Sequence, residues 1–105
     1  MLSPSPDRVF EALGDSTRRR ILELLGDQTR SVSALQQPLG ISLAGVVQHV
    51  KVLESSGLLS TEKVGRVRFC RVSHDGLIVA SSWIAERKVQ FERKLDRLDD
   101  LLAED

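Results

Sequence analysis

Residues 31–72 read SVSALQQPLGISLAGVVQHVKVLESSGLLSTEKVGRVRFCRV, and this stretch decides the fold. Its first part predicts a short helix, a turn at Gly40 and a second helix stopped by Gly57, because glycine readily adopts the positive φ of such turns. The remainder predicts two strands joined by a tight turn at Gly65 and Arg66. The order is therefore a helix-turn-helix followed by a basic β-hairpin, or wing, whose shape and charge fit duplex DNA.

The second helix of this unit should begin after Ser42, whose hydroxyl can cap it. Val46, Val50 and Leu53 follow at spacings of four and three and should face the core. On the opposite face, Gln48 is the best candidate to read a base, because its amide can form two hydrogen bonds to adenine. Together with the hairpin, the expected DNA-binding residues are Ser42, Leu43, Ala44, Val47, Gln48, Lys51, Lys63, Arg66 and Arg68.

Individual roles follow from side-chain chemistry. Lys51 and the start of the helix at Ser42 suit phosphate contacts. Arg66, at the hairpin tip, suits a minor groove, where a narrow A·T tract has the most negative potential. Arg71 is expected only to pair with the nearby acidic helix. Gly45 has two interpretations: it lets the helix backbone approach the groove floor, or it is a tolerated weakness costing roughly 1 kcal/mol.

Two helices should precede this unit, over residues 7–26. Pro6 suits a first helical turn, Asp15 can cap the second helix and Gly26 can end it. Arg18–Arg20 lie early in the second helix, either as a solvated face or with one or two of them against a phosphate.

From His74 onward the chain predicts one long helix. Its apolar residues recur every seven positions, and two further leucines follow Phe91 and Leu98 by four residues. A domain this small has too little chain to cover such a stripe, whereas a two-fold partner could cover it. Trp83 is expected to pack in that dimer rather than to hold a ligand. The expected interface residues of this helix are Leu77, Ile84, Phe91, Leu95, Leu98 and Leu102.

The charge distribution supports a nucleic-acid partner, although the formal net charge of the 105 residues is zero. Between residues 28 and 74 six Lys and Arg side chains face two Glu, a net charge of +4, whereas residues 96–105 carry five acidic side chains and one Arg. The local field, rather than the net charge, steers a charged ligand. This uneven distribution of charge therefore indicates that the middle of the chain binds DNA.

Other classes are disfavoured by what the sequence contains. One cysteine, Cys70, allows no internal disulfide and no cysteine-cluster metal site. No apolar run approaches the roughly 20 residues of a membrane span, and the opening six residues are too short and Pro-rich for a signal peptide, so we expect a cytoplasmic protein. The sequence shows neither a Gly-rich phosphate loop nor a nucleophile–base pair, which argues against an enzyme, and no cofactor is expected. The alternative is a winged-helix module that binds another protein through its long last helix.

Two further side chains have competing interpretations. Cys70, on the second hairpin strand, is expected to be a small apolar filler, with a redox switch as the alternative. His49 is expected to be a partly buried, hydrogen-bonded histidine at the helix junction rather than a metal ligand.

Two segments carry a resemblance to a known family: residues 9–25, VFEALGDSTRRRILELL, and residues 46–59, VVQHVKVLESSGLL. They resemble the opening helices and the recognition helix of the ArsR-type (arsenic-repressor-like) bacterial transcription regulators, and the resemblance runs from about Asp7 to the end. It implies a mainly α fold of five helices plus a two-stranded wing. It also implies a homodimer formed by the first and last helices, which adds Phe10 to the interface, and repression through an operator of two-fold symmetry.

The chain departs from this family in two places. Val47 stands where the family often has a serine, so a hydroxyl is replaced by a side chain that could press on a thymine methyl. Metal-sensing members carry thiols before the recognition helix, or carboxylate and histidine ligands on the last helix. Residues 31–39 contain neither Cys nor His, and the last helix has no His after His74. The resemblance therefore implies a member without a bound metal.

The predicted organisation is a single winged helix-turn-helix domain over residues 1–105, bacterial or archaeal in origin. Ser33 is expected to cap the first helix of the helix-turn-helix. The predicted parts are the first two helices over 7–26, the helix-turn-helix over 33–57, the wing over 58–72 and the C-terminal dimerisation helix over 75–103.

Overall fold

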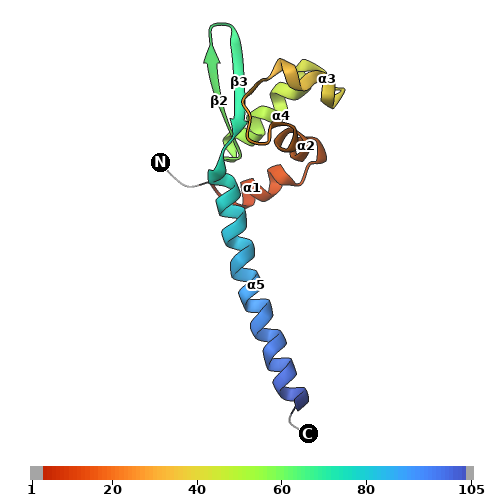
Figure 1. Ribbon diagram of the computed structural model, residues 1–105, viewed down its shortest axis with the longest axis vertical. Coiled ribbons are helices and arrows are strands. Elements are labelled where there is room, and N and C mark those ends of the chain that lie inside the picture. The colour runs from red at the N-terminus through yellow and green to blue at the C-terminus, as the bar shows by residue number, and fades with distance from the viewer. Residues whose placement is uncertain (1–3, 104–105) are drawn as a thin grey trace.

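The computed structural model describes residues 4–103 and confirms a mainly α fold with a winged helix-turn-helix (Figure 1). The predicted domain over 1–105 includes residues 1–3 and 104–105, which lie outside the described residues. The elements are α1 (Pro6–Leu13), α2 (Ser16–Leu25), β1 (Arg30–Ser31), a 3₁₀ turn η1 (Ser33–Leu35), α3 (Gln36–Leu39), α4 (Leu43–Ser55), β2 (Leu59–Val64), β3 (Val67–Val72) and α5 (His74–Ala103).

Helix ends lie where their capping residues predict. The Asp15 carboxylate accepts a hydrogen bond from the Arg18 backbone N–H at 2.9 Å, and the Ser42 hydroxyl accepts one from the Gly45 N–H at 3.1 Å. Gly26, after α2, has a φ of 55°. Each cap satisfies a backbone group that the helix itself leaves without a partner.

The sheet has three antiparallel strands in the order β1-β3-β2, one more than the predicted hairpin. In β1, Arg30 pairs with Cys70 and Ser31 pairs with Phe69 of β3. A strand of two residues has too few positions to show an alternating pattern, so only the tertiary pairing reveals it. The expected Ser33 cap is wrong: the Ser31 hydroxyl accepts the Ala34 N–H at 3.2 Å instead.

The core lies where the helices meet the sheet and contains the predicted inward face of α4. At its edge α5 starts against the end of α4, with the Gly76 N–H donating to the Gly57 carbonyl at 2.7 Å. A Cβ on Gly76 would lie 2.8 Å from that oxygen, so only glycine fits this approach. The buried apolar residues are Val9, Ala12, Ile21, Leu25, Val32, Leu35, Val46, Val50, Leu53, Leu58, Leu59, Cys70 and Ala80.

Helix α5 gives the molecule its elongated shape, with principal extents of 71 × 33 × 21 Å. In Figure 1 the wing projects from one end of the domain and α5 runs away from the other. Every residue from Lys88 to Ala103 is exposed, so the second half of α5 packs against no other part of the described chain. No helix within residues 4–103 combines the length and the hydropathy that crossing a membrane requires.

Candidate nucleic-acid interface

Helix α4 presents its outer face to solvent because its inward apolar face is fixed in the core. Val46, Val50 and Leu53 are buried, and their spacing orients the remaining positions outward. Most side chains predicted to reach DNA are accordingly exposed. Those exposed residues are Ser42, Leu43, Ala44, Gln48 and Lys51.

Val47 takes a different position from the other predicted contacts. It is half-buried and packs against the core, and it borders two grooves between α4 and the wing. Any base contact of Val47 must therefore come from the part of its side chain that borders these grooves. At Gly45 an added Cβ would make only ordinary contacts, the nearest 3.4 Å from Ser42 Oγ, so the fold itself does not require glycine here.

The wing is held in a fixed register by its turn. Val64 pairs with Val67, which leaves Gly65 and Arg66 as a two-residue turn, as predicted. Gly65 has a φ of 63° and Arg66 a negative φ, the pattern of a type II′ turn with glycine first. Arg66 is exposed at the tip of the hairpin.

The register also decides which wing cations face α4. Cys70 is buried in the core, and Arg68, two residues earlier on β3, lies on the same face of the sheet. Lys63 is directly opposite Arg68 on β2 and shares that face. Lys63 and Arg68 are therefore turned toward the side on which α4 lies.

Arg68 is held by neighbours that sequence reasoning missed. Its Nη1 donates to Thr61 Oγ1 at 2.9 Å, and the Thr61 hydroxyl in turn donates to Glu54 Oε2 on α4. Nothing in the local sequence pattern predicts these two hydrogen bonds, because their three residues come from three elements that meet only in the folded domain.

Two adjoining grooves separate α4 from the wing. One, of about 170 Å³, is bordered by Lys51, Glu54 and Arg68, and the other, of about 280 Å³, by Leu43, Arg66 and Arg68. Val47 and Arg68 border both. The structure thus brings cations of the helix and of the wing to one continuous concave surface.

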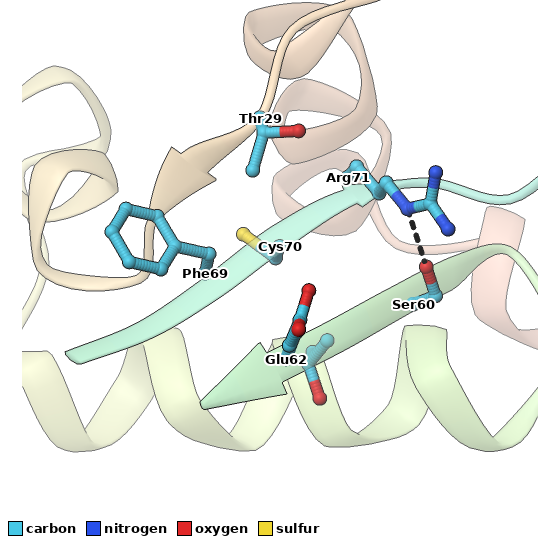
Figure 2. Close-up of a pocket in the computed structure, with 7 residues that line it drawn as sticks. Thr29, Ser60, Glu62, Phe69, Cys70 and Arg71 are labelled. Carbon is cyan, nitrogen blue, oxygen red and sulfur yellow. Dashed lines mark hydrogen bonds between the residues drawn. The ribbon is translucent and has the colours of Figure 1, made fainter. Parts of the chain in front are cut away.

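A third concavity, of about 480 Å³, lies on the sheet and includes the outer face of β2 and β3 (Figure 2). There Arg71 Nε donates to Ser60 Oγ at 3.2 Å, so the expectation that Arg71 pairs with an acidic helix is wrong. Ser60 lies directly opposite Arg71 in the register and provides the nearer partner. The lining residues are Thr29, Ser60, Thr61, Glu62, Phe69, Cys70 and Arg71.

Cys70 is a core side chain, which fits the apolar-filler hypothesis. Its thiol is buried and lies 3.4 Å from the Arg30 carbonyl oxygen, to which it donates. Burial raises the pKa of the Cys70 thiol to about 11. The thiol is therefore protonated near neutral pH and is a poor nucleophile.

His49 lies at the junction of α4 and α2 and is partly buried, as predicted. The predicted hydrogen bond is wrong for this neighbour: His49 Nδ1 is 3.8 Å from the Asp15 carboxylate, too long for a hydrogen bond. The Arg18 backbone N–H, with smaller charge effects from Arg18 and His49, lowers the pKa of Asp15 below its usual value. Among residues 4–103, no three His, Cys, Asp or Glu side chains are arranged to hold a metal ion.

Two of the three early arginines of α2 support α1. Arg18 donates to the carbonyl oxygens of Ala12 and Glu11, at 2.8 and 3.1 Å, and Arg19 donates to that of Leu13 at 2.7 Å. The last carbonyls of a helix lack the usual partners of its interior, and here only that of Glu11 also accepts the Gly14 N–H, at 3.2 Å. The two arginines therefore cap the C-terminus of α1. Arg20 pairs with Glu23 at 3.7 Å. Arg18 and Arg19 are thus structural, a role that neither interpretation of the sequence included.

A second exposed surface is the predicted stripe of α5. Where α5 leaves the domain, Phe10 of α1 packs edge-on against Trp83, with ring centroids 5.4 Å apart, and the Arg87 guanidinium lies over the indole at 5.0 Å. The apolar side chains of the stripe are exposed in the single chain. The exposed members of the stripe are Leu77, Ile84, Phe91, Leu95, Leu98 and Leu102.

Comparisons with known proteins agree with this geometry. A family model described as a helix-turn-helix domain matches residues 13–62. The chain is 38% identical over 73 residues to the HTH-type transcriptional regulator Rv2034 of Mycobacterium tuberculosis, a match that covers 70% of this chain and 68% of that protein.

The chain is also similar to solved structures of transcriptional regulators. The ArsR family transcriptional regulator RHA00566 is 33% identical, with a TM-score of 0.77 over 87% of this chain and 97% of that one. The homodimeric winged helix-turn-helix DNA-binding domain Mb0332 of Mycobacterium bovis, a possible ArsR-family regulator, is 29% identical, with a TM-score of 0.62 over 83% of this chain and 79% of that one. The chain therefore belongs to the ArsR family of winged helix-turn-helix, DNA-binding transcriptional regulators.

Proposed function

We propose that the protein is a cytoplasmic repressor that binds a two-fold symmetric operator as a homodimer, each protomer contributing one winged helix-turn-helix domain. The observation that carries the proposal is the continuous concave surface bordered by Lys51 of α4 and by Arg66 and Arg68 of the wing. On this surface α4 enters the major groove, where Gln48 reads base edges, and the wing tip enters the adjacent minor groove.

The long helix supplies the second part of the proposal. The stripe from Leu77 to Leu102 is exposed in the single chain, and the similar Mb0332 domain is described as homodimeric. Packing α5 and Phe10 of one protomer against the same surface of another covers the stripe and produces a two-fold axis. That axis would match the symmetry of the operator.

The salt dependence of DNA binding tests the interface. With Lys51, Lys63, Arg66 and Arg68 on each of two protomers, up to eight cations contact the duplex, so log K should fall with log salt at a slope approaching about −7. The measurement is fluorescence anisotropy of a labelled mixed-sequence duplex titrated with the protein between about 50 and 200 mM salt. A slope near zero would show that this basic surface does not meet phosphates.

A further inference from the structure

We propose that Thr61 and Glu54 are positioning residues, which hold the Arg68 guanidinium in place for a DNA phosphate before DNA arrives. The inference rests on the proposed function, in which Arg68 belongs to the DNA-binding surface. It adds two residues that do not touch DNA themselves and order the Arg68 side chain.

The chemistry of the three side chains fixes which one donates and which one accepts in each of the two hydrogen bonds. An arginine can only donate, so Thr61 Oγ1 accepts from Arg68 Nη1 at 2.9 Å and its single proton is left for Glu54 Oε2. The carboxylate is an acceptor, which makes the hydroxyl–carboxylate bond charge-assisted. Each of the three groups therefore has one role in the chain, and the hydroxyl cannot reverse its orientation while both bonds are made.

The two hydrogen bonds link the recognition helix to both strands of the wing. Glu54 lies near the C-terminal end of α4, Thr61 on β2 and Arg68 on β3. Thr61 is opposite Cys70 in the register, so Thr61 and Arg68 are diagonal neighbours on the face of the sheet toward α4. The Arg68 side chain is thus tied to the helix with which it must share the duplex.

Arg68 keeps the capacity to bind DNA while it is held. One of its five N–H donors is used by Thr61, and the side chain remains exposed and borders both grooves between α4 and the wing. A free arginine loses side-chain freedom when it binds a phosphate, which weakens binding. Because Thr61 has already ordered Arg68, that loss is reduced.

The test replaces the hydroxyl without changing any charge. Thr61→Val keeps the β-branched shape and should lower the affinity for the mixed-sequence duplex about 5- to 150-fold, the cost of ordering one side chain in each of two protomers. The slope of log K against log salt should be unchanged, because Arg68 still reaches its phosphate. Thr61→Ser restores the hydroxyl and should restore the affinity. Glu54 is a poorer probe, since removing its charge would itself strengthen DNA binding.

A double-mutant cycle isolates the dependence on Arg68. Arg68→Ala should weaken binding and reduce the slope by about two units per dimer, and adding Thr61→Val to it should cost nothing further. The proposal is overturned if Thr61→Val binds like the wild type, or if it costs as much without Arg68 as with it. It is also overturned if Arg68→Ala leaves affinity and slope unchanged. The proposed function would survive all three results, provided that DNA binding still requires Lys51 and Arg66.

Discussion

Replacing Lys51 and Arg66 together by alanine should reduce the affinity for duplex DNA on the order of 1000-fold at low salt. A dimer loses four cations, and each phosphate contact contributes almost one unit of salt dependence, so the slope should change from about −7 to about −4. Lys51 lies on α4 and Arg66 at the wing tip, and both are exposed and free of core contacts. The fold should therefore be unaffected, and circular dichroism should show the same thermal transition.

The matched control removes the same number of charges elsewhere. Arg93 and Lys94 are exposed on the half of α5 that projects away from the wing (Figure 1). Replacing both by alanine should leave the affinity within a few-fold of the wild type. Equal losses in the two double variants would mean that overall charge, rather than the surface between α4 and the wing, determines DNA binding.

Replacing Ile84 and Phe91 by lysine should convert the proposed dimer into a monomer. In the single chain these side chains are 54% and 61% exposed, so the substitutions remove no intrachain core contact. In the dimer they would place charges without partners in a buried apolar seam, and facing copies would repel each other. Affinity for a two-fold symmetric operator should fall by two to four orders of magnitude. In a dimer, binding at one half-site holds the second domain close to the other half-site, and a monomer lacks this effect.

Val89 provides the control for this substitution. It is 46% exposed and lies two residues before Phe91, on nearly the opposite side of the helix. Val89→Lys should remain dimeric in size-exclusion chromatography with light scattering. If the Ile84 and Phe91 variant also stays dimeric, the stripe is not the dimer interface, and a heterotypic protein partner for α5 becomes the better explanation.

The sequence predicted those parts of the fold that depend on local chemistry. The caps at Asp15 and Ser42, the buried face of α4 and the turn at Gly65 all follow from residue type and spacing, and all are confirmed. Each involves residues within a few positions of one another. Such features require no knowledge of the tertiary arrangement.

The features that were missed depend on segments meeting in space. Strand β1 exists because Arg30 and Ser31 reach β3, and the arginines at 18 and 19 are structural because α1 ends beside α2. The bonds from Arg68 to Thr61 and on to Glu54 are of the same kind. The candidate DNA-binding side chains could therefore be named from the sequence, whereas what holds them in place could not.

Sedimentation velocity of the protein mixed with a labelled duplex tests the central claim most directly. We expect a dimer in the absence of DNA, and two protomers moving with each duplex at low salt. A stable monomer that leaves the sedimentation of the duplex unchanged, even in dilute buffer, would contradict the account.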